Sequence, residues 1–275
     1  MAKAPLQKVG KVGENVSSFY DKDGWTLEGD VTRDAILNED LRAVAEEYVS
    51  RCRRRILRHL PSGGEKILDA ASGPVQYPEY LEYSQNFKER HCVDMSQKAL
   101  DQAREKLGER GRYLHGDLLT LDLGAGFDAV ISLHTIYHIH RDQQEEAVLK
   151  LLRSCRIGAP LVIVYSNPKY LLGRCVRLFR GLIGKKREVA SGDGLYFFSH
   201  PLSWWERFRE VAQVEFYPWR SLSSRHQKLL LPDNVIGKLM FRALFWFEER
   251  FSTFFVRNLK FTTIVLRARE NLEGS

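Results

Sequence analysis

The feature that most constrains this fold is the passage from a short apolar run into a turn of small residues, over 65–76. Ile67 and Leu68 are typical of a buried parallel strand, and Asp69 ends that strand. The turn at 70–73 holds only alanine, serine and glycine, so no bulky side chain keeps a ligand away from its backbone N–H groups. The sequence therefore predicts a binding crevice beside the end of the strand.

Two further acids follow, each at the end of a short apolar segment. Asp94 ends the segment 90–94, and Asp117 follows the segment 112–116. Because the carboxyl ends of parallel strands meet at one edge of a sheet, the three acids are expected to converge on a single crevice. A single aspartate at such a place is often only a helix cap, but three in the same register call for another explanation.

Helical and strand patterns alternate along the middle of the chain. Helical patterns cover about 76–86, 96–108 and 142–155, and strand patterns cover about 90–94, 112–116, 127–133, 160–166, 214–217 and 261–266. This alternation predicts right-handed crossovers and a doubly wound, mostly parallel α/β sheet. A long helix over about 34–60 is expected before the first strand.

Composition favours one α/β domain with additions. The chain has 275 residues, of which 44% are hydrophobic, which is enough for one sizeable core. The four cysteines lack metal-ligand spacing and suit a reducing compartment, so we expect a cytoplasmic protein without a bound metal. No window of the sequence has the apolar length of a membrane span, and the first residues lack the apolar core of a signal peptide.

The net charge of +7 is unevenly distributed. Five arginines lie within 51–58, where they would complement the dipole at the end of the expected helix; a nucleic-acid groove is the weaker alternative, and no nucleic-acid partner is expected. The stretch 169–187 has seven cations and no acid, with apolar residues at helical spacing. Such a helix can rest on an anionic membrane surface, or it can pack on the domain and leave its cations in solvent.

Residues 65–166 resemble the core of a class I S-adenosylmethionine-dependent methyltransferase. That family has a strand followed by acid-x-Gly-x-Gly-x-Gly, and this chain has Asp69-Ala70-Ala71-Ser72-Gly73-Pro74-Val75, which keeps only the middle glycine. Alanine is expected to replace glycine without penalty if its φ is negative. The resemblance implies a Rossmann-like, mostly parallel sheet of seven strands, with an antiparallel last strand between its predecessors and helical lid and cap insertions.

The resemblance also implies S-adenosylmethionine as the cofactor. Asp69 and Gly73 would line its methionine end, Asp94 would accept hydrogen bonds from both ribose hydroxyls, and Asp117 would meet the adenine amino group. Met95 and Leu118 would flank the adenine ring. The complete expected set is Asp69, Ala71, Gly73, Asp94, Met95, Asp117, Leu118 and Ser132.

A nicotinamide dinucleotide site is the competing interpretation of the same turn. It requires Gly-x-Gly-x-x-Gly and an acid about 20 residues further on, and Asp94 would serve as that acid. The third glycine, however, would fall at Gln76, and Pro74 and Tyr77 would crowd the turn. An oxidoreductase is therefore the less supported class.

Candidate catalytic residues lie beyond the fourth strand and in the N-terminal segment. A sulfonium is already a good leaving group, so the protein must align the acceptor and, for a hydroxyl, remove a proton. His134 and His138 follow the fourth strand and are candidate bases, although a histidine there can also simply bind the backbone. Tyr20 and His200 are the next candidates; Tyr20 lies in an aromatic segment that resembles the lid of many small-molecule methyltransferases.

These observations predict methyl transfer to a small-molecule acceptor, with an oxygen of a sugar, lipid-linked or secondary-metabolite intermediate favoured. A carbon or nitrogen acceptor, or a non-catalytic module of this fold that binds ligands or membranes, stays open. We expect a lid and a leading helix over 1–60 and the methyltransferase domain over 61–275. Insertions at about 167–200 and 221–257 are expected to select the acceptor, the second of them as a packed cap helix rich in Phe and Trp.

Overall fold

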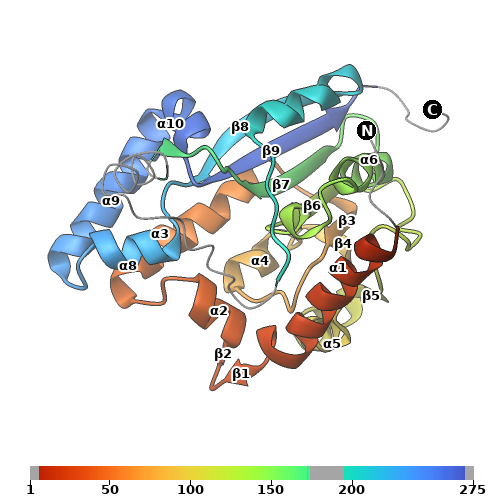
Figure 1. Cartoon of the computed structure of the whole chain (residues 1–275), viewed down its shortest axis with the longest axis horizontal. Coiled ribbons are helices and arrows are strands. Elements are labelled where there is room, and N and C mark those ends of the chain that lie inside the picture. Colours follow the sequence, from red (N-terminus) through yellow and green to blue (C-terminus); the bar gives the residue numbers. More distant parts are fainter. Residues whose placement is uncertain (1–5, 172, 174–194, 270–275) are drawn as a thin grey trace.

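The structure, a computed structural model, describes residues 6–171, 173 and 195–269. Its main sheet contains β3 (Gly64–Ala70), β4 (Phe87–Asp94), β5 (Gly111–His115), β6 (Ala129–Leu133), β7 (Pro160–Ser166), β8 (Ala212–Arg220) and β9 (Phe261–Ala268). The strands lie in the order β5-β4-β3-β6-β7-β9-β8 (Figure 1). From β3 the chain adds β4 and β5 on one side of the sheet, and it then adds β6 and β7 on the other side. Such a switch in the order of the strands creates a crevice at their carboxyl ends.

The first five of these strands pair in parallel, and β9 pairs antiparallel with both β7 and β8. Ile264, Val265 and Leu266 of β9 are fully buried. The central place of β9 follows from its sequence, because β-branched residues such as Ile264 and Val265 suit a strand covered on both faces. The predicted fold, with seven strands and an antiparallel last strand between its predecessors, is confirmed.

Helices cover both faces of the sheet. On one face, α6 (Gln144–Ser154) and the 3₁₀ segment η5 (Leu202–Glu210) pack in a core cluster that includes Leu68. On the other face, a second cluster joins Ile67 to Tyr83, next to α4 (Pro78–Glu82). The neighbours Ile67 and Leu68 serve opposite faces, as the alternation along a strand requires. A third helix, α5 (Gln97–Leu107), follows β4 and packs against β4 and β5.

The expected long helix over 34–60 is wrong. The structure has α2 (Arg33–Asn38), α3 (Ala43–Arg54) and a 3₁₀ turn, η2 (Arg55–Arg58). The break occurs because the Asp40 carboxylate accepts hydrogen bonds from the Arg42 backbone N–H at 3.3 Å and from its guanidinium at 2.7 Å. Such a local contact between an aspartate and the backbone competes with a continuous helix and starts a new one.

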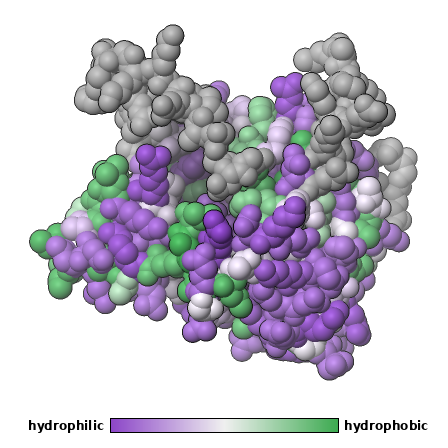
Figure 2. Space-filling model, turned by 60° about the horizontal axis from the view of Figure 1, so that its bottom comes forward, coloured by the Kyte–Doolittle hydropathy of each residue, from purple (hydrophilic) through white to green (hydrophobic). Residues whose placement is uncertain are grey.

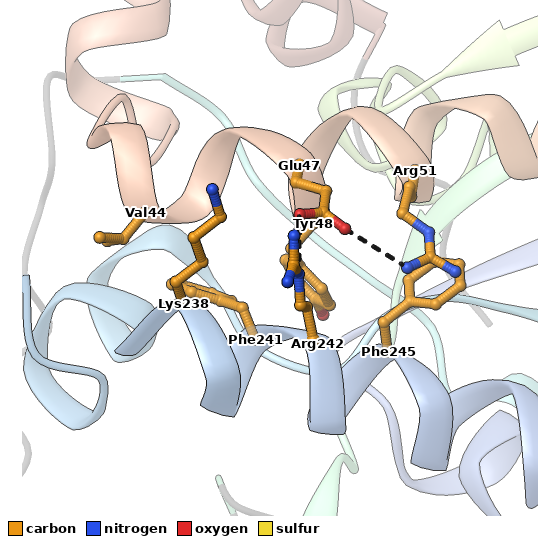
Figure 3. Close-up of a pocket in the computed structure, with 8 residues that line it drawn as sticks. All are labelled: Val44, Glu47, Tyr48, Arg51, Lys238, Phe241, Arg242 and Phe245. Atoms are coloured by element: carbon orange, nitrogen blue, oxygen red, sulfur yellow. Dashed lines mark hydrogen bonds and ion pairs between the residues drawn. The ribbon is translucent and has the colours of Figure 1, made fainter. Parts of the chain in front are cut away.

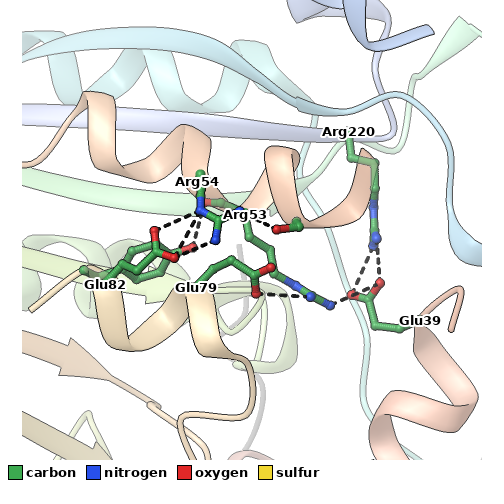
Figure 4. A network of polar contacts seen from close by, with 8 residues as sticks. Glu39, Arg53, Arg54, Glu79, Glu82 and Arg220 are labelled. Atoms are coloured by element: carbon green, nitrogen blue, oxygen red, sulfur yellow. Dashed lines mark hydrogen bonds and ion pairs between the residues drawn. The ribbon is translucent and has the colours of Figure 1, made fainter. Parts of the chain in front are cut away.

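The arginines of 51–58 are all paired with carboxylates inside the protein. The partner of Arg54 is Glu82 and that of Arg53 is Glu79 (Figure 4), while Arg55 and Arg58 reach the C-terminal half of the chain. Arg51 is paired with Glu47 and lies over an aromatic ring. These arginines hold elements together and do not form an open basic groove.

The segment between β8 and β9 forms three helices: α8 (Ser224–Leu230), α9 (Val235–Arg250) and α10 (Ser252–Asn258). Phe241 and Phe245 of α9 pack on Tyr48 of α3. Beside them, the buried Glu248 carboxylate accepts hydrogen bonds from the Tyr48 hydroxyl at 2.8 Å and the Arg55 guanidinium at 2.9 Å. One face of α9 is therefore a packed cap. The basic stretch 169–187 lies mostly outside the described residues.

Within the described ranges, each helix is too short or too polar to cross a bilayer. The same part of the chain holds no cluster of side chains suited to a metal ion.

Candidate cofactor and acceptor site

The turn after β3 has an unusual backbone. Ala71, Gly73 and Val75 occupy the three glycine positions of the family motif, and their φ angles are 58°, 55° and 47°. The condition under which alanine replaces glycine without penalty, a negative φ, is therefore not met at position 71. A side chain in the left-handed region costs about 1–2 kcal/mol, and a β-branched residue there is rarer still. The chain keeps the shape of the glycine turn without two of its glycines.

Asp94 ties this turn to the end of β4. Its Oδ2 accepts a hydrogen bond from the Gly73 N–H at 2.8 Å, and its Oδ1 accepts one from the Ser96 N–H at 2.9 Å. Burial raises the pKa of the Asp94 carboxyl to about 6, against the effect of these two N–H donors. The ribose contact expected of Asp94 stays a prediction, and its position at the crevice suits that role.

Asp69 lies deeper than the resemblance implies. It is 3% exposed, and its Oδ2 is paired with the guanidinium of Arg90, whose Nε lies 3.1 Å away. Arg90 also donates to the Tyr80 carbonyl, which fixes it beneath the turn. Sequence reasoning missed Arg90, although an arginine inside an apolar strand next to a strand-end acid is a usable signal for a buried ion pair.

Helix α1 (Leu6–Phe19) passes over the expected adenine end of the site. A Cβ atom on Gly13 would lie 3.5 Å from the Met95 side chain and 3.7 Å from Asp117 Oδ2. The Ser17 hydroxyl donates to the Met95 carbonyl. Leu118 is buried in the main core cluster. The structure thus brings Met95 and Asp117 together beneath α1, while Leu118 supports them from below.

The π-helical turn η1 (Tyr20–Gly24) continues this lid over the glycine turn. The Trp25 ring would lie 3.1 Å from a Cβ atom on Gly73, so a side chain there would crowd the ring, and the φ of 55° also favours glycine. Tyr20 stacks on Trp25 with ring centroids 4.8 Å apart. The Ser96 hydroxyl donates to Asp21, which fastens the turn to the end of β4.

The residues around the turn fit S-adenosylmethionine. Gly73 has no Cβ atom to keep a ligand from the backbone of the turn, and the buried Trp25 Nε1 has no hydrogen-bond partner within the described residues. The buried Ser132 hydroxyl on β6 is likewise without a partner among those residues. A polar ligand would satisfy such donors, because an unpaired buried polar atom is unfavourable. Gly73, Asp94, Trp25 and Asp117 are the residues that would hold the cofactor.

His134 follows β6 directly, with a φ of 62°. Its Nδ1 shares a hydrogen bond of 3.0 Å with the Tyr137 hydroxyl, and its ring lies edge-on to Phe261, with centroids 5.1 Å apart. Burial and the charge of Arg220 lower the pKa of His134 to about 3. His134 is therefore a neutral imidazole across the physiological pH range.

His138, one turn further, is held by the backbone. Its Nδ1 donates to the Tyr196 carbonyl at 2.8 Å, which leaves Nε2 as the acceptor of the neutral ring. Burial lowers the pKa of His138 to about 4. His138 thus matches the alternative interpretation of the sequence, in which a histidine at this place binds the backbone.

The other two catalytic candidates differ in position. Tyr20 lies close enough to Asp94 and Tyr137 for their charges to interact, and burial, with Asp34 and Asp94, raises the pKa of Tyr20. It thus lies between the cofactor side and the acceptor side. His200 instead stacks its ring on Trp204 of η5, with centroids 4.4 Å apart, and its backbone N–H donates to the hydroxyl of Tyr165 on β7.

An ion pair that sequence reasoning missed closes the acceptor side. Arg220 ends β8 and donates to Glu39, in the α2–α3 connection, at 2.6 Å; Arg53 lies 3.9 Å from the same carboxylate (Figure 4). Burial opposes ionisation of Glu39, but Arg220 and Arg53 hold its pKa below the usual range. The charges of Arg220 and Glu39 both act on the pKa of His134, so the ion pair and the histidine belong to one site.

Two surface pockets lie elsewhere. The first, between α3 and α9, is lined by Val44, Glu47, Tyr48, Arg51, Lys238, Phe241, Arg242 and Phe245 (Figure 3). Within it Arg242 pairs with Glu47 at 2.8 Å, so it is a seam between packed helices. The second lies beside the amino ends of β3 and β4, lined by residues such as Leu60 and Phe87. Neither contains an expected site residue.

Comparisons with known proteins agree with this geometry. Residues 68–163 match the family model described as a methyltransferase domain. Among curated proteins, none matches the sequence.

Solved structures share the fold at low identity. The N-methyltransferase NodS from Bradyrhizobium japonicum WM9, in complex with S-adenosylhomocysteine, is 12% identical with a TM-score of 0.56, over 93% of this chain and 100% of that one. Magnesium protoporphyrin IX methyltransferase from Synechocystis PCC 6803 is 15% identical with a TM-score of 0.56, over 93% and 98%. Phosphoethanolamine N-methyltransferase 2 from Haemonchus contortus is 14% identical with a TM-score of 0.55, over 93% and 60%.

At such identities the likeness concerns the fold, and the family match lies on the part of the chain that carries the glycine-type turn and the strand-end acids. The nicotinamide alternative has no support in these comparisons. The chain carries a methyltransferase domain over residues 68–163, and its fold is that of S-adenosylmethionine-dependent methyltransferases.

Proposed function

We propose that this enzyme methylates a hydroxyl oxygen of a small-molecule acceptor, and that the acceptor lies between His134 and Tyr20. The observation that carries the proposal is the orientation of His134. With Nδ1 as the donor to the Tyr137 hydroxyl, Nε2 is the acceptor of the neutral ring, and no hydrogen bond joins Nε2 to another of the described residues. A neutral imidazole with one free ring nitrogen at a strand exit is suited to take a proton.

The proton transfer follows from the residues present. Bound S-adenosylmethionine supplies a methyl group on a positively charged sulfur, which is a good leaving group. His134 takes the proton of the acceptor hydroxyl as the new carbon–oxygen bond forms, and becomes an imidazolium. The Glu39 carboxylate favours this imidazolium, whereas Arg220 opposes it. With a pKa of about 3, His134 accepts the proton only when methyl transfer has made the hydroxyl acidic.

The choice of oxygen rests on this base. The structures that share the fold carry names for N-methylation and for methylation of magnesium protoporphyrin IX, so the fold leaves the acceptor atom open. A neutral amine is nucleophilic enough to attack with its proton in place, whereas a hydroxyl is a poorer nucleophile and gains more from a base that accepts its proton as the new bond forms. A histidine held for proton removal therefore favours oxygen.

The test is methyl transfer from labelled S-adenosylmethionine to a panel of hydroxyl and amine acceptors, with wild type and His134→Asn. Asparagine tolerates the left-handed backbone at this position. We expect label on hydroxyl acceptors and a rate lower by about 10²–10⁴-fold in the variant. Cofactor affinity, measured by calorimetry, should change less than about threefold.

The matched control is His140→Asn, because His140 stacks on Tyr196 outside this group. It should keep the wild-type rate. Label that appears only on amines, or a His134→Asn variant with unchanged turnover, would refute the proposal.

A further inference from the structure

The outward face of α9 is apolar along its whole length. Buried residues of α9 face α3, while Ile236, Leu239, Met240, Ala243, Trp246 and Phe247 are exposed. These exposed residues follow one another at intervals of three and four, so they form one stripe on the helix. A helix with two apolar faces, of which only one is packed, lacks a partner for the other within the described residues.

The stripe continues onto the neighbouring helices. Val235 is 75% exposed and Leu229 of α8 is 76% exposed at one end, and Phe254 of α10 is 59% exposed at the other. Trp246 and Phe247 contact each other, and both contact Phe251, with ring centroids 4.9–6.3 Å apart. Figure 2 shows hydrophobic side chains at the end of the molecule that α8 and α9 form in Figure 1. Monomeric proteins rarely expose such a continuous patch without a function.

The charges around this apolar face are almost all positive. Over 222–258 the exposed cations are Arg225, Lys228, Lys238, Arg242, Arg250 and Arg257. This segment has three acids. Glu248 is buried and Glu249 is paired with Arg55 and Arg58, which leaves Asp233 as the one exposed acid outside these pairs. Of the cations, Arg242 is paired with Glu47. An apolar, aromatic face with a cationic border is complementary to the surface of an anionic bilayer.

We propose that α8, α9 and α10 dock on the surface of a membrane containing anionic lipids, with the outward face of α9 in the interface. Trp and Phe side chains favour this zone, because their rings tolerate the boundary between headgroups and acyl chains. The three helices leave the sheet after Arg220 and return at Phe261, which are paired at the carboxyl edge beside His134. Docking therefore places the acceptor side of the site next to the lipid surface.

Vesicle sedimentation tests the proposal, with vesicles of phosphatidylcholine alone or mixed with phosphatidylglycerol. Wild type should bind the mixed vesicles at least about tenfold more strongly at about 0.1 M salt, and this preference should shrink at about 1 M, where the Debye length falls to about 3 Å. Trp246→Gln combined with Phe247→Gln should weaken binding at least about tenfold, because two side chains that would enter the interface are lost.

The matched control is Leu81→Gln combined with Ile157→Gln, two exposed apolar residues away from α8–α10, and it should bind as wild type does. The assay contains neither cofactor nor acceptor, so its result is independent of the proposed oxygen methylation. Absence of binding to mixed vesicles at low salt overturns the proposal. So does equal loss in both double variants, or a lipid-free dimer in sedimentation velocity that the first double variant abolishes, since the face would then serve a second copy.

Discussion

At the scale of single residues, the left-handed positions of the glycine turn show what the sequence pattern concealed. Ala71 and Val75 adopt φ angles that favour glycine, and yet the turn keeps its contacts with Asp94. At Val75 the cost is offset by packing, because its side chain is buried against Leu100. Ala71 has no such compensation in its small side chain, so its conformation is held by the surrounding turn.

Ala71→Gly should therefore stabilise the protein. The relief of strain, about 1–2 kcal/mol, outweighs the cost of the added backbone entropy, about 0.5–1 kcal/mol, so the free energy of unfolding should rise by up to about 1.5 kcal/mol. Ala70→Gly is the matched control. Because Ala70 lies in β3, the free energy of unfolding of this variant should fall by about 0.5–1 kcal/mol. Denaturant titration of both variants measures the difference, and a loss of stability in Ala71→Gly would contradict the account of strain.

Asp94 should make cofactor affinity depend on pH. Its pKa of about 6 in the ligand-free protein lies above that of an ordinary aspartate, so Asp94 gains a proton as the pH falls through 6. A protonated carboxyl is a poorer acceptor for ribose hydroxyls, so affinity should fall by up to about tenfold per pH unit below that point. Calorimetric titration with S-adenosylmethionine between pH 5 and pH 8 would show it. In Asp94→Asn, affinity should be weak at every pH; a constant affinity in wild type would count against the ribose role.

At the scale of elements, regular patterns were predictable and local polar contacts were not. Expected strands such as 160–166 coincide with β7, because buried parallel strands leave a continuous apolar signal. The buried Arg90–Asp69 and Arg220–Glu39 pairs depend on partners that only the folded chain brings together. The break at Asp40 comes from a local contact with Arg42, which leaves no mark on the helical pattern. For the same reason the motif identified the cofactor side of the site, whereas the acceptor side required the structure.

The attachment of α9 gives a test at this scale. Glu248 is fully buried and binds Arg55, Tyr48 and Ser221. Glu248→Ala therefore removes the buried carboxylate partner of Arg55, which keeps the partly exposed Glu249, and it leaves the buried Tyr48 hydroxyl without its acceptor. Removal of one member of a buried pair costs about 3–5 kcal/mol. The control Glu47→Ala breaks an exposed pair with Arg242 and should cost less than about 1 kcal/mol. Chemical denaturation distinguishes the two, and equal small losses would mean that apolar packing alone holds α9.

At the scale of the whole molecule, the buried ionisable groups of the lid and of the sheet edge make the stability of the fold depend on pH. His138 has a pKa of about 4, below the ordinary value near 6.5, so the folded protein binds fewer protons than the unfolded chain between these limits. Protonation at low pH therefore favours unfolding, and the stabilising contribution of a neutral His138 is lost as the pH falls from about 6.5 to about 4. Asp34 and Asp94, with pKa values raised to about 6 by burial, act in the opposite direction over the same range.

A difference measurement separates these opposing effects. The unfolding free energy of wild type minus that of His138→Gln should decline as the pH falls from 6.5 to 4, by up to about 1.4 kcal/mol per pH unit. Above pH 7 the difference should be constant, which provides an internal control. A difference that does not vary with pH would show that His138 is protonated as readily in the folded as in the unfolded protein.

The place of β9 between β7 and β8 also constrains the order in which the chain can fold. Among the described strands β8 pairs only with β9, so residues 212–220 have no neighbour in that sheet until residues 261–268 have left the ribosome. The residues of α8–α10 are synthesised in that interval, before the strand that closes their loop. During synthesis their aromatic face is thus presented to the surroundings while β7 is still an open edge, which is the stage at which chaperones or a nearby bilayer compete with self-association.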